Sequence, residues 1–322
     1  MRIINWGGII SHLFVPDAEG KLADIVLGFE EPSDYLNEHP YFGAIVGRYA
    51  NRINKGHFIY NGISYQLTIN QGSHHLHGGI KGFDKVFWDC TQIDKKNLIL
   101  RYISPDADQG YPGTLRVQVK YSLSEHNELR IDYKATTDRT TFLNLSQHTY
   151  FNLSGIPKET IAQHELTIDA DYFTEIDDEM IPTGKLVPVD ARMNFKSRRN
   201  IGLYLNELKH GYDHNYVLRN KKGLKKVADL FHSTSGRLME VYTTQPGLQF
   251  YTGNFLNGSI IGKGKEAYQK HRGLCLETQH FPDSPNHQEF PSTLLRPGDL
   301  YHQTTIYKFS ALTPHHPDQS QW

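Results

Sequence analysis

The chain has 322 residues, and its 34 Lys and Arg nearly balance 35 Asp and Glu, giving a formal net charge of -1 at pH 7. It contains no run of five or six like charges, which excludes the electrostatic signature of a protein that binds nucleic acid or an anionic membrane surface. No segment reaches the roughly 18 apolar residues of a membrane-spanning helix, so we expect no membrane partner.

The N-terminal segment, MRIINWGGIISHLFVPD, has neither a sustained apolar stretch nor a small-residue cleavage site, and so does not resemble a secretory signal. The two cysteines, Cys90 and Cys275, lie far apart in the sequence and form no C-x-x-C pattern. We interpret them as buried thiols in a reducing compartment. The chain is therefore expected to be a soluble cytoplasmic protein.

The first clear element is a hairpin in the segment HFIYNGISYQLTI. Asn61 and Gly62 separate two runs rich in β-branched and aromatic residues, and this pair favours a two-residue turn in which both residues have positive φ. Two longer strands follow at 115–123 and 129–135, where apolar residues alternate with polar ones. The short SEHN segment between them predicts an antiparallel pair.

Further strand patterns recur through the rest of the chain, while helical patterns are scarce. The later predicted strands are 165–168, 216–219, 227–231, 237–243, 248–251, 273–277 and 304–309. The segment NIGLYLNEL can form a helix of two or three turns with Asn200 as its N-cap. Evenly spread strands predict an all-β fold, a large antiparallel β-sandwich or barrel with few short helices. We expect one domain over residues 1–310 and a loosely held tail over 311–322.

The segment HHLHGG, residues 74–79, raises the question of a metal site. His75 and His77 form an H-x-H pair, whose side chains point the same way on a strand and can share an ion. The carboxylate that completes such a site in cupin-type barrels does not follow at the expected distance. The double glycine also favours a loop over a strand. We therefore predict no metal site.

Several catalytic motifs are absent from the chain, namely G-x-S-x-G, G-x-x-x-x-G-K-[ST], H-E-x-x-H and G-x-G-x-x-G. Their absence argues against serine hydrolases, phosphate-loop proteins, zinc proteases and dinucleotide-binding enzymes. Polar residues instead gather beside aromatic residues and glycines in six segments. These are GRYANRI, HHLHGG, NLSQHTYFNLSG, GYDHNYVL, PGLQFYTGNFL and GLCLETQHFPDSPN. Donors and acceptors beside aromatic faces suit a neutral polyol, which indicates a protein that binds or processes sugars.

The order and separation of these segments resemble the aldose 1-epimerase (galactose mutarotase) family. The similarity begins near Leu22, passes through DIVLGFEEPSDYL and GFDKVFWD, and ends in the final predicted strand near Phe309. The resemblance implies a galactose mutarotase-like β-supersandwich whose concave face holds the sugar. It also implies an enzyme that interconverts the α and β anomers of free hexoses such as galactose and glucose. No cofactor is implied, and the choice between monomer and homodimer stays open.

The resemblance further implies roles for individual residues. His148 of QHTYF matches the general acid, and Glu277 of LETQH matches the general base. His77 of LHGG matches a second active-site histidine, near the ring oxygen of the sugar. The residues that match binders of sugar hydroxyls are Asn51, Arg52, Asp213 and Gln249. His74 and His75 match nothing in this machinery, and we interpret them as structural residues of a loop or rim.

The implied reaction suits an acid and a base without a metal. Ring opening requires a proton on the ring oxygen while another proton leaves the C1 hydroxyl, and the two groups exchange roles when the ring closes. Attraction between His148 and Glu277 favours their charged forms, whereas burial favours their neutral forms. Gln147 stands where members of the family often carry Asn, and we expect it to influence the orientation of His148.

Two alternatives remain at this point. A hexose 6-phosphate 1-epimerase needs a phosphate clamp, and the only compact basic cluster is Lys196, Arg198 and Arg199 of FKSRRN. The second alternative is a sugar-binding or regulatory protein without catalysis. The intact pair of His148 and Glu277 argues against it, because loss of selection on the chemistry is expected to damage one of the two.

Overall fold

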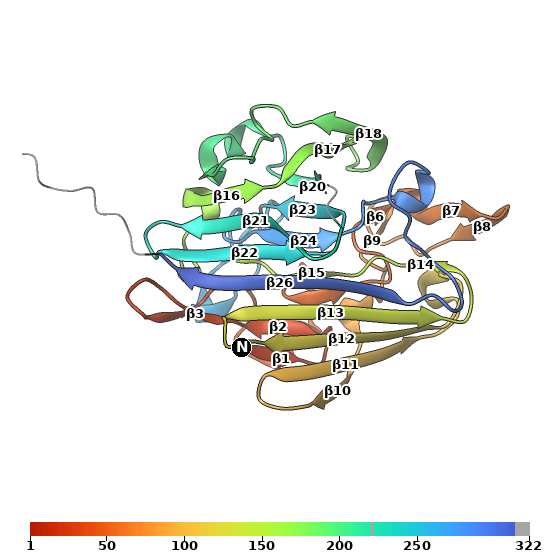
Figure 1. The fold of residues 1–322 in the computed structure, drawn as a ribbon, viewed down its shortest axis with the longest axis horizontal. Helices are drawn as coiled ribbons and strands as arrows, with labels where there is room; N and C mark the ends of the chain where they lie inside the picture. Colours follow the sequence, from red (N-terminus) through yellow and green to blue (C-terminus); the bar gives the residue numbers. More distant parts are fainter. Residues whose placement is uncertain (220–221, 313–322) are drawn as a thin grey trace, which may run out of the picture.

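The computed structural model describes residues 1–219 and 222–312, which form strands and short 3-10 helices. Two large antiparallel sheets dominate, one of nine strands and one of five (Figure 1). This arrangement confirms the predicted all-β fold of large antiparallel sheets. Among the described residues, no helix is long and apolar enough to span a membrane.

The nine-stranded sheet has its last strand in sequence near its middle. Its order is β10 (Asp89–Gln92), β11 (Asn97–Ser104), β12 (Leu115–Leu123), β13 (Glu128–Thr137), β26 (Tyr301–Ala311), β22 (Arg237–Thr243), β21 (Lys225–His232), β16 (His164–Ile168) and β19 (Arg199–Asn200). In Figure 1 the blue strand β26 lies beside the yellow strand β13. The final strand thus joins the early strands of this sheet to the later ones.

The five-stranded sheet carries polar residues in register on its neighbouring strands. Its order is β18 (Pro182–Pro188), β17 (Ala170–Ile176), β20 (Asp213–Leu218), β23 (Gly247–Tyr251) and β24 (Cys275–Gln279). Gln249 of β23 lies between Asn215 of β20 and Glu277 of β24. Tyr251 likewise lies between Asp213 and Cys275. One face of this sheet therefore presents two amides, two carboxyl groups, a phenol and a thiol side by side.

Smaller elements surround the two sheets. The two-stranded pairs are β1 (Arg2–Ile4) with β2 (Ile9–His12), β3 (Phe14–Pro16) with β4 (Leu22–Asp24), β5 (Ala44–Val46) with β15 (Ser146–His148), β6 (Arg52–Ile53) with β9 (His75–Leu76), β7 (His57–Tyr60) with β8 (Ile63–Gln66), and β14 (Thr141–Phe142) with β25 (Leu294–Leu295). The 3-10 helices are η1 (Pro32–Leu36), η2 (Asn54–Gly56), η3 (Phe83–Lys85), η4 (Asp108–Gly110), η5 (Ile161–Gln163), η6 (Ile201–Leu203), η7 (Leu205–Glu207), η8 (Lys263–Lys265) and η9 (Ser284–Asn286).

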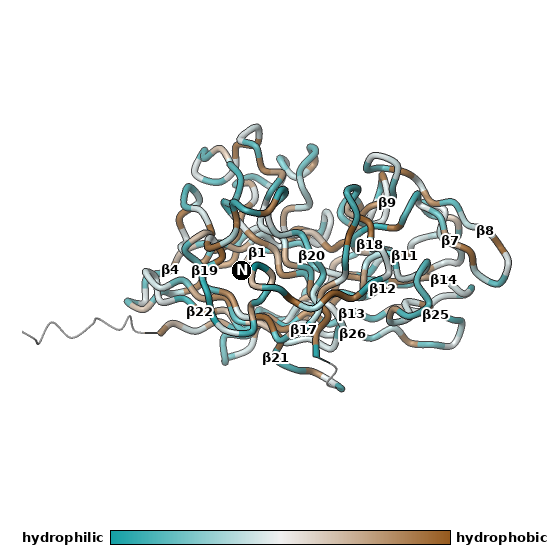
Figure 2. Tube along the Cα trace, turned by 90° about the horizontal axis from the view of Figure 1, so that it is seen from above, coloured by the Kyte–Doolittle hydropathy of each residue, from teal (hydrophilic) through white to brown (hydrophobic). Residues whose placement is uncertain are grey.

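Alternating burial explains how the long strands form the core. In β12 and β13 the apolar positions are buried, and Val119 pairs with Tyr133 as Tyr121 pairs with Ile131. These residues belong to one apolar cluster with residues of the five-stranded sheet, such as Phe250. Each fully buried side chain of this size contributes about 1.5–3 kcal/mol to folding. Viewed from above, hydrophobic and hydrophilic positions alternate along the chain (Figure 2), as a sandwich requires.

The predicted hairpin is confirmed. β7 and β8 pair on either side of Asn61 and Gly62, whose φ angles are 49° and 75°. The hairpin projects at one end of the molecule in both views (Figures 1 and 2). The predicted pairing of the strands at 115–123 and 129–135 is also confirmed, as β12 and β13.

The predicted helix after Asn200 is wrong. The segment forms the separate 3-10 helices η6 and η7, and the side chain of Asn200 makes no capping hydrogen bond. Asn200 instead pairs with Glu165 through strand β19. Gly202 lies inside the segment, and glycine costs about 1 kcal/mol relative to alanine within a helix.

Three further expectations concern strand bounds, the cysteines and the tail. β20 begins at Asp213 and β24 spans Cys275–Gln279, so both strands include polar residues that the sequence pattern assigned to their ends. Both cysteines are free, but Cys90 is exposed on β10, and the interpretation of two buried thiols holds for Cys275 alone. β26 extends through Ala311, and residues 313–322 of the predicted tail lie outside the described residues.

Candidate active site

A cavity of about 210 Å³ brings together most of the predicted site residues. Those that line it are Asn51, Arg52, His77, His148, Asp213 and Glu277. Gln249 does not line the cavity, but its side-chain amide donates a hydrogen bond to Asp213 at 2.6 Å. A larger groove of about 640 Å³ on the nine-stranded sheet contains none of these residues. The cavity beside β24 is therefore the candidate active site.

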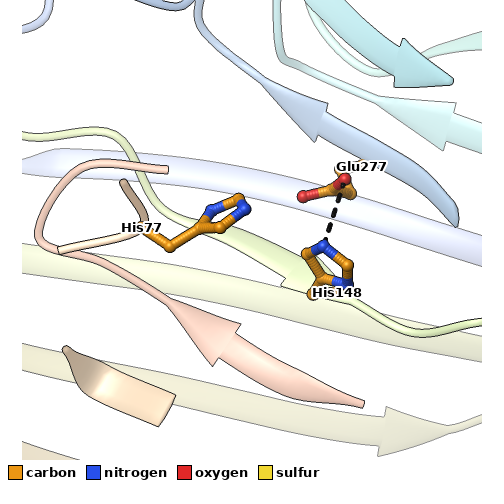
Figure 3. A group of neighbouring side chains, drawn as sticks. All are labelled: His77, His148 and Glu277. Atoms are coloured by element: carbon orange, nitrogen blue, oxygen red, sulfur yellow. Dashed lines mark ion pairs between the residues drawn. The ribbon is translucent and has the colours of Figure 1, made fainter. Parts of the chain in front are cut away.

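His148 and Glu277 both line the cavity, and their side chains face each other. His148 ends strand β15, Glu277 occupies the middle of β24, and Ser146 Oγ donates to the carbonyl of Thr278 at 2.9 Å between the two strands. The Nε2 atom of His148 lies 3.7 Å from Oε1 of Glu277 (Figure 3). Both side chains are buried, and Glu277 Oε2 has no hydrogen-bond partner among the described residues. The pair is therefore positioned to act on neighbouring oxygen atoms of one ligand.

Burial determines the charge state of this pair. It lowers the pKa of His148 to about 4, against a smaller raising effect of the residue's own backbone carbonyl. Burial also raises the pKa of Glu277 well above its usual range, and the negative charge of Asp213 adds to the rise while Arg52 opposes it. Desolvation thus outweighs the attraction between the two groups. Both shifts favour the neutral forms of the pair, with its proton on the carboxyl group.

His77 lies in a tight turn that directly follows β9 and that glycine makes possible. Gly78 has a φ of 93°, and a Cβ atom there would lie 1.7 Å from the carbonyl oxygen of Gly47. This close approach places His77 beside Asn51, whose backbone N–H donates to its Nδ1 atom at 3.0 Å. Because Nδ1 accepts that bond, the neutral ring carries its proton on Nε2. The ring of His77 packs edge-to-face against His148 at 5.2 Å between centroids (Figure 3).

The tautomer of His77 bears directly on metal binding. The side chains of His77, His148 and Glu277 place their ligand atoms within 4.8 Å of one another. A metal ligand must present an unprotonated nitrogen, usually with its other N–H donated to an acceptor. The Nδ1 atom of His77 instead faces the Asn51 N–H donor. This cluster therefore fits a metal ion poorly and is better suited to hydrogen bonding and proton transfer.

Arg52 and Asp213 add ionisable groups to the lining of the cavity. Arg52 Nε donates to Oε1 of Gln71 at 2.8 Å, which fixes the guanidinium at the cavity surface. Asp213 begins β20, and burial raises the pKa of its carboxyl group, while the charge of Arg52 and the hydrogen bond from Gln249 act in the opposite direction. A buried acceptor beside a fixed cation suits the recognition of neighbouring hydroxyl groups.

Seven lining residues were missed by the sequence reasoning. Four are aromatic, Tyr41, Tyr150, Tyr251 and Phe255, and the others are Pro40, Gln71 and Leu76. Tyr150 and Tyr251 follow His148 and Gln249 by two residues, so the two-residue repeat of a strand could have identified them. Tyr41 has a φ of 60° and packs against both His77 and His148, an arrangement that no sequence pattern indicates.

His74 and His75 are structural, but the expectation that they lie at a rim is wrong, because both are buried. The Nδ1 atom of His75 lies 2.7 Å from the carbonyl of Thr68, and Nε2 lies 2.8 Å from the Tyr111 hydroxyl. His74 accepts a hydrogen bond from the backbone of Lys55. These bonds occupy both ring nitrogens of His75, which therefore shares no ion with His77.

The side chain of Gln147 contacts a different part of the fold from His148. It donates to the Tyr121 hydroxyl at 3.1 Å, on the side of β15 that faces the nine-stranded sheet. The expected influence on His148 therefore does not act through a side-chain contact. The predicted basic cluster does not line the cavity either. This holds for all three of its residues, Lys196, Arg198 and Arg199, and Lys196 forms an ion pair with Asp171.

The chain is similar to proteins of one family over nearly its whole length. The family described as aldose 1-epimerase matches residues 1–308. Galactose mutarotase of Rattus norvegicus is 48% identical over 310 residues, which cover 96% of this chain and 90% of that protein. Aldose 1-epimerase of Escherichia coli K12 is 37% identical over 320 residues, covering 97% and 92%. The crystal structure of an aldose epimerase homologue from C. elegans superposes with a TM-score of 0.91 at 31% identity, covering 97% and 95% of the two chains.

Proposed function

This chain belongs to the aldose 1-epimerase family, and we propose from that premise that its cavity interconverts the α and β anomers of free aldohexoses such as galactose. The activity is that of an isomerase acting on a small sugar. The observation that carries the assignment of the reacting groups is the 3.7 Å approach of His148 Nε2 to Glu277 Oε1 at the cavity surface.

His148 is the general acid and Glu277 the general base in this proposal. In ring opening, Glu277 takes the proton of the C1 hydroxyl while His148 gives a proton to the ring oxygen on the same carbon. The C1–O5 bond breaks and an open-chain aldehyde forms. After rotation about C1–C2 the two groups exchange roles. As the ring closes on the other face, Glu277 gives a proton to the C1 oxygen and His148 takes the proton of the C5 hydroxyl.

The electrostatics of the pair are consistent with this cycle. The pair needs one proton in total, held by His148 before ring opening and by Glu277 after it. Burial favours the form with the proton on Glu277, because that form leaves both groups uncharged. The balance between the two forms can shift when the sugar supplies hydrogen bonds.

The remaining lining residues bind the sugar in this proposal. Asn51, Arg52 and Asp213 contact hydroxyl groups away from C1, and Gln249 holds Asp213 in place through its 2.6 Å hydrogen bond. The Nε2–H of His77 donates to the sugar near the ring oxygen. Its Nδ1 atom faces the Asn51 N–H, so protonation there would cost that bond, which favours His148 over His77 as the acid.

The two alternatives are not favoured. The basic cluster that a phosphate clamp would use does not line the cavity. A protein that binds sugar without turnover has no need of an acid and a base close to each other. The relatives of this chain also include galactose mutarotases and aldose 1-epimerases.

Polarimetry on freshly dissolved α-D-galactose tests the proposal. The unmodified chain should accelerate the approach to anomeric equilibrium, and glucose 6-phosphate should compete less well than galactose. Glu277→Gln and His148→Asn should each lower kcat about 10²–10⁴-fold. Glu289→Gln, which changes an exposed carboxylate, is the matched control. Wild-type kcat in either site variant, at an unchanged melting temperature, would contradict the assignment.

Two broader proposals follow from other observations. Residues 1–310 act as one domain, since a single apolar cluster includes residues of both large sheets. A cytoplasmic location is supported by two free cysteines, one of them exposed, because exposed thiols persist in a reducing compartment.

A further inference from the structure

Strand β24 supplies a group to each nitrogen of the His148 ring. Cys275 and Glu277 are two residues apart on this strand, so their side chains leave it on the same face. The Sγ atom of Cys275 lies 3.5 Å from Nδ1 of His148, and Oε1 of Glu277 lies 3.7 Å from Nε2. The imidazole therefore lies between a thiol and a carboxyl group.

We propose that Cys275 is a positioning residue, whose sulfur accepts a hydrogen bond from Nδ1–H of His148 and so keeps Nε2 as the nitrogen that exchanges protons with the sugar. The inference rests on the proposed role of His148 as the acid. It assigns to a cysteine the task that a carboxylate performs beside the histidine of a serine protease.

The position of Cys275 fits orientation of the ring and not direct attack on the sugar. Its side chain is fully buried and does not line the cavity. Burial and the charges of Glu277 and Asp213 raise the pKa of the thiol well above its usual range, so the sulfur stays protonated and is a poor nucleophile.

A thiol suits the chemistry of the ring better than a carboxylate at this position. His148 must release its Nε2 proton readily, and a second carboxylate beside Nδ1 would stabilise the charged ring and oppose that release. A thiol is a weak, uncharged acceptor that fixes the ring without adding charge. The other rings packed around His148 are Tyr41, His77, Tyr150 and Tyr251, and none of them adds a negative charge near neutral pH.

Three substitutions separate hydrogen bonding from packing. Cys275→Ser keeps an acceptor, Cys275→Val fills the space without one, and Cys275→Ala removes both. We expect the serine variant to stay within about twofold of wild-type kcat, and the valine and alanine variants to lose about five- to tenfold, with KM changed less than twofold. Cys90→Ser, at an exposed cysteine on β10, is the control and should match the wild type. Melting temperatures show whether each variant is folded at the assay temperature.

A spectroscopic readout tests the tautomer itself. Nitrogen-15 correlation spectra of the histidine rings, with the His148 signal identified by its absence in His148→Asn, should show the Nδ1–H form in the wild type and in Cys275→Ser. The Nε2–H form should increase in Cys275→Val. An Nε2–H tautomer in the wild-type protein overturns the proposal even if no Cys275 variant folds.

The kinetic outcomes distinguish this inference from the proposed function. Wild-type kcat in Cys275→Val beside a large loss in His148→Asn overturns the role of the thiol and leaves His148 as the acid. Equal losses in the serine and valine variants, at equal stability, also overturn it, because an acceptor then confers no advantage. Wild-type kcat in His148→Asn instead overturns the proposed function.

Discussion

The backbone N–H of Asn51 donates to Nδ1 of His77 across 3.0 Å, so this histidine presents an N–H to the cavity. The ring of His148 lies 5.2 Å from that of His77, measured between centroids. Its Nδ1 atom faces the thiol of Cys275 instead of a backbone N–H. Two neighbouring imidazoles thus have different partners behind them. If Nδ1–H of His148 donates to the thiol, as proposed above, this ring can take up and release a proton at Nε2 without breaking its hydrogen bond at Nδ1, whereas the ring of His77 cannot.

This asymmetry predicts different effects for the two histidines. His77→Phe keeps an aromatic ring but removes the Nε2–H donor, and we expect kcat/KM to fall about tenfold, as for the loss of one well-placed hydrogen bond. His148→Asn should lower kcat by a further factor of ten or more. Initial rates from polarimetry at several galactose concentrations separate the two. An equal loss of kcat in both variants would show that the partner of Nδ1 does not decide the role.

Asp213→Asn should raise KM and also lower kcat. The substitution removes the charge that faces Arg52 and weakens the acceptor of the Gln249 amide, and hydrogen bonds to charged groups contribute about 1.5–3 kcal/mol. The corresponding loss in kcat/KM is roughly 10–150-fold. kcat falls as well because remote contacts help to hold C1 against the reacting pair. An unchanged KM would contradict the proposal that Asp213 binds the sugar. Asp299→Asn, at an exposed carboxylate outside the cavity, is the control.

The dependence of kcat/KM on pH should be bell-shaped, because the active pair holds one proton. The acid limb marks the arrival of a second proton, and since burial lowers the pKa of His148 to about 4, this limb should lie near that pH in the free enzyme. The alkaline limb marks loss of the last proton, and it lies well above the usual pKa of a glutamate because burial raises that of Glu277. Both limbs belong to the coupled pair. A rate that only rises with pH would contradict a shared proton.

Stability should fall as the pH is lowered from about 6.5 towards 4. Burial lowers the pKa to about 4 at five histidines, His39, His75, His148, His214 and His280. Between the two pH values the unfolded chain binds protons at these side chains and the native chain does not, so unfolding becomes more favourable. The contribution is fully present above pH 6.5. Melting temperatures at pH 7, 6 and 5 check this, and a constant melting temperature would be inconsistent with neutral buried rings.

His75→Ala should destabilise the fold by about 2–4 kcal/mol and leave kcat near the wild-type value. The change leaves the Thr68 carbonyl and Tyr111 hydroxyl without their partner and opens a cavity in a fully buried position. Urea unfolding measures the loss, and polarimetry well below the melting temperature measures kcat. His126→Ala, at an exposed turn, is the control and should change stability by less than about 0.5 kcal/mol. A similar small effect at His75 would show that its bonds contribute little.

Much of the fold was predictable because burial follows the two-residue repeat. The long strands β12 and β13 alternate apolar and polar residues, and Asn61 and Gly62 set the hairpin turn. β20 and β24 were harder to delimit, because they bury polar residues at or beyond the ends that a one-sided hydrophobic pattern gives them. Those exceptions include Asp213 and Glu277, which the cavity requires. The positions where the pattern fails are therefore the positions of the site.

The site itself was predictable only in part. The resemblance to a family supplied His148 and Glu277, which are distant in sequence but adjacent in the fold. It could not supply the direction of their pKa shifts, because desolvation depends on the packing around both residues. The contact between Cys275 and His148 joins positions 127 residues apart and leaves no periodic signal. Tyr150, in contrast, follows His148 by only two residues and lines the same cavity.

The place of β26 in the nine-stranded sheet has a consequence for how the chain is made. β26 joins β13 to β22, yet it is the last strand of the described chain to leave the ribosome. Until it emerges, β13 and β22 each present an unpaired edge, which is prone to associate with other chains. A nascent polypeptide that stops before Tyr301 already contains His148 and Glu277, but lacks the strand that joins β13 to β22. The nine-stranded sheet is thus expected to close only after β26 has been synthesised, although most of its strands are made much earlier.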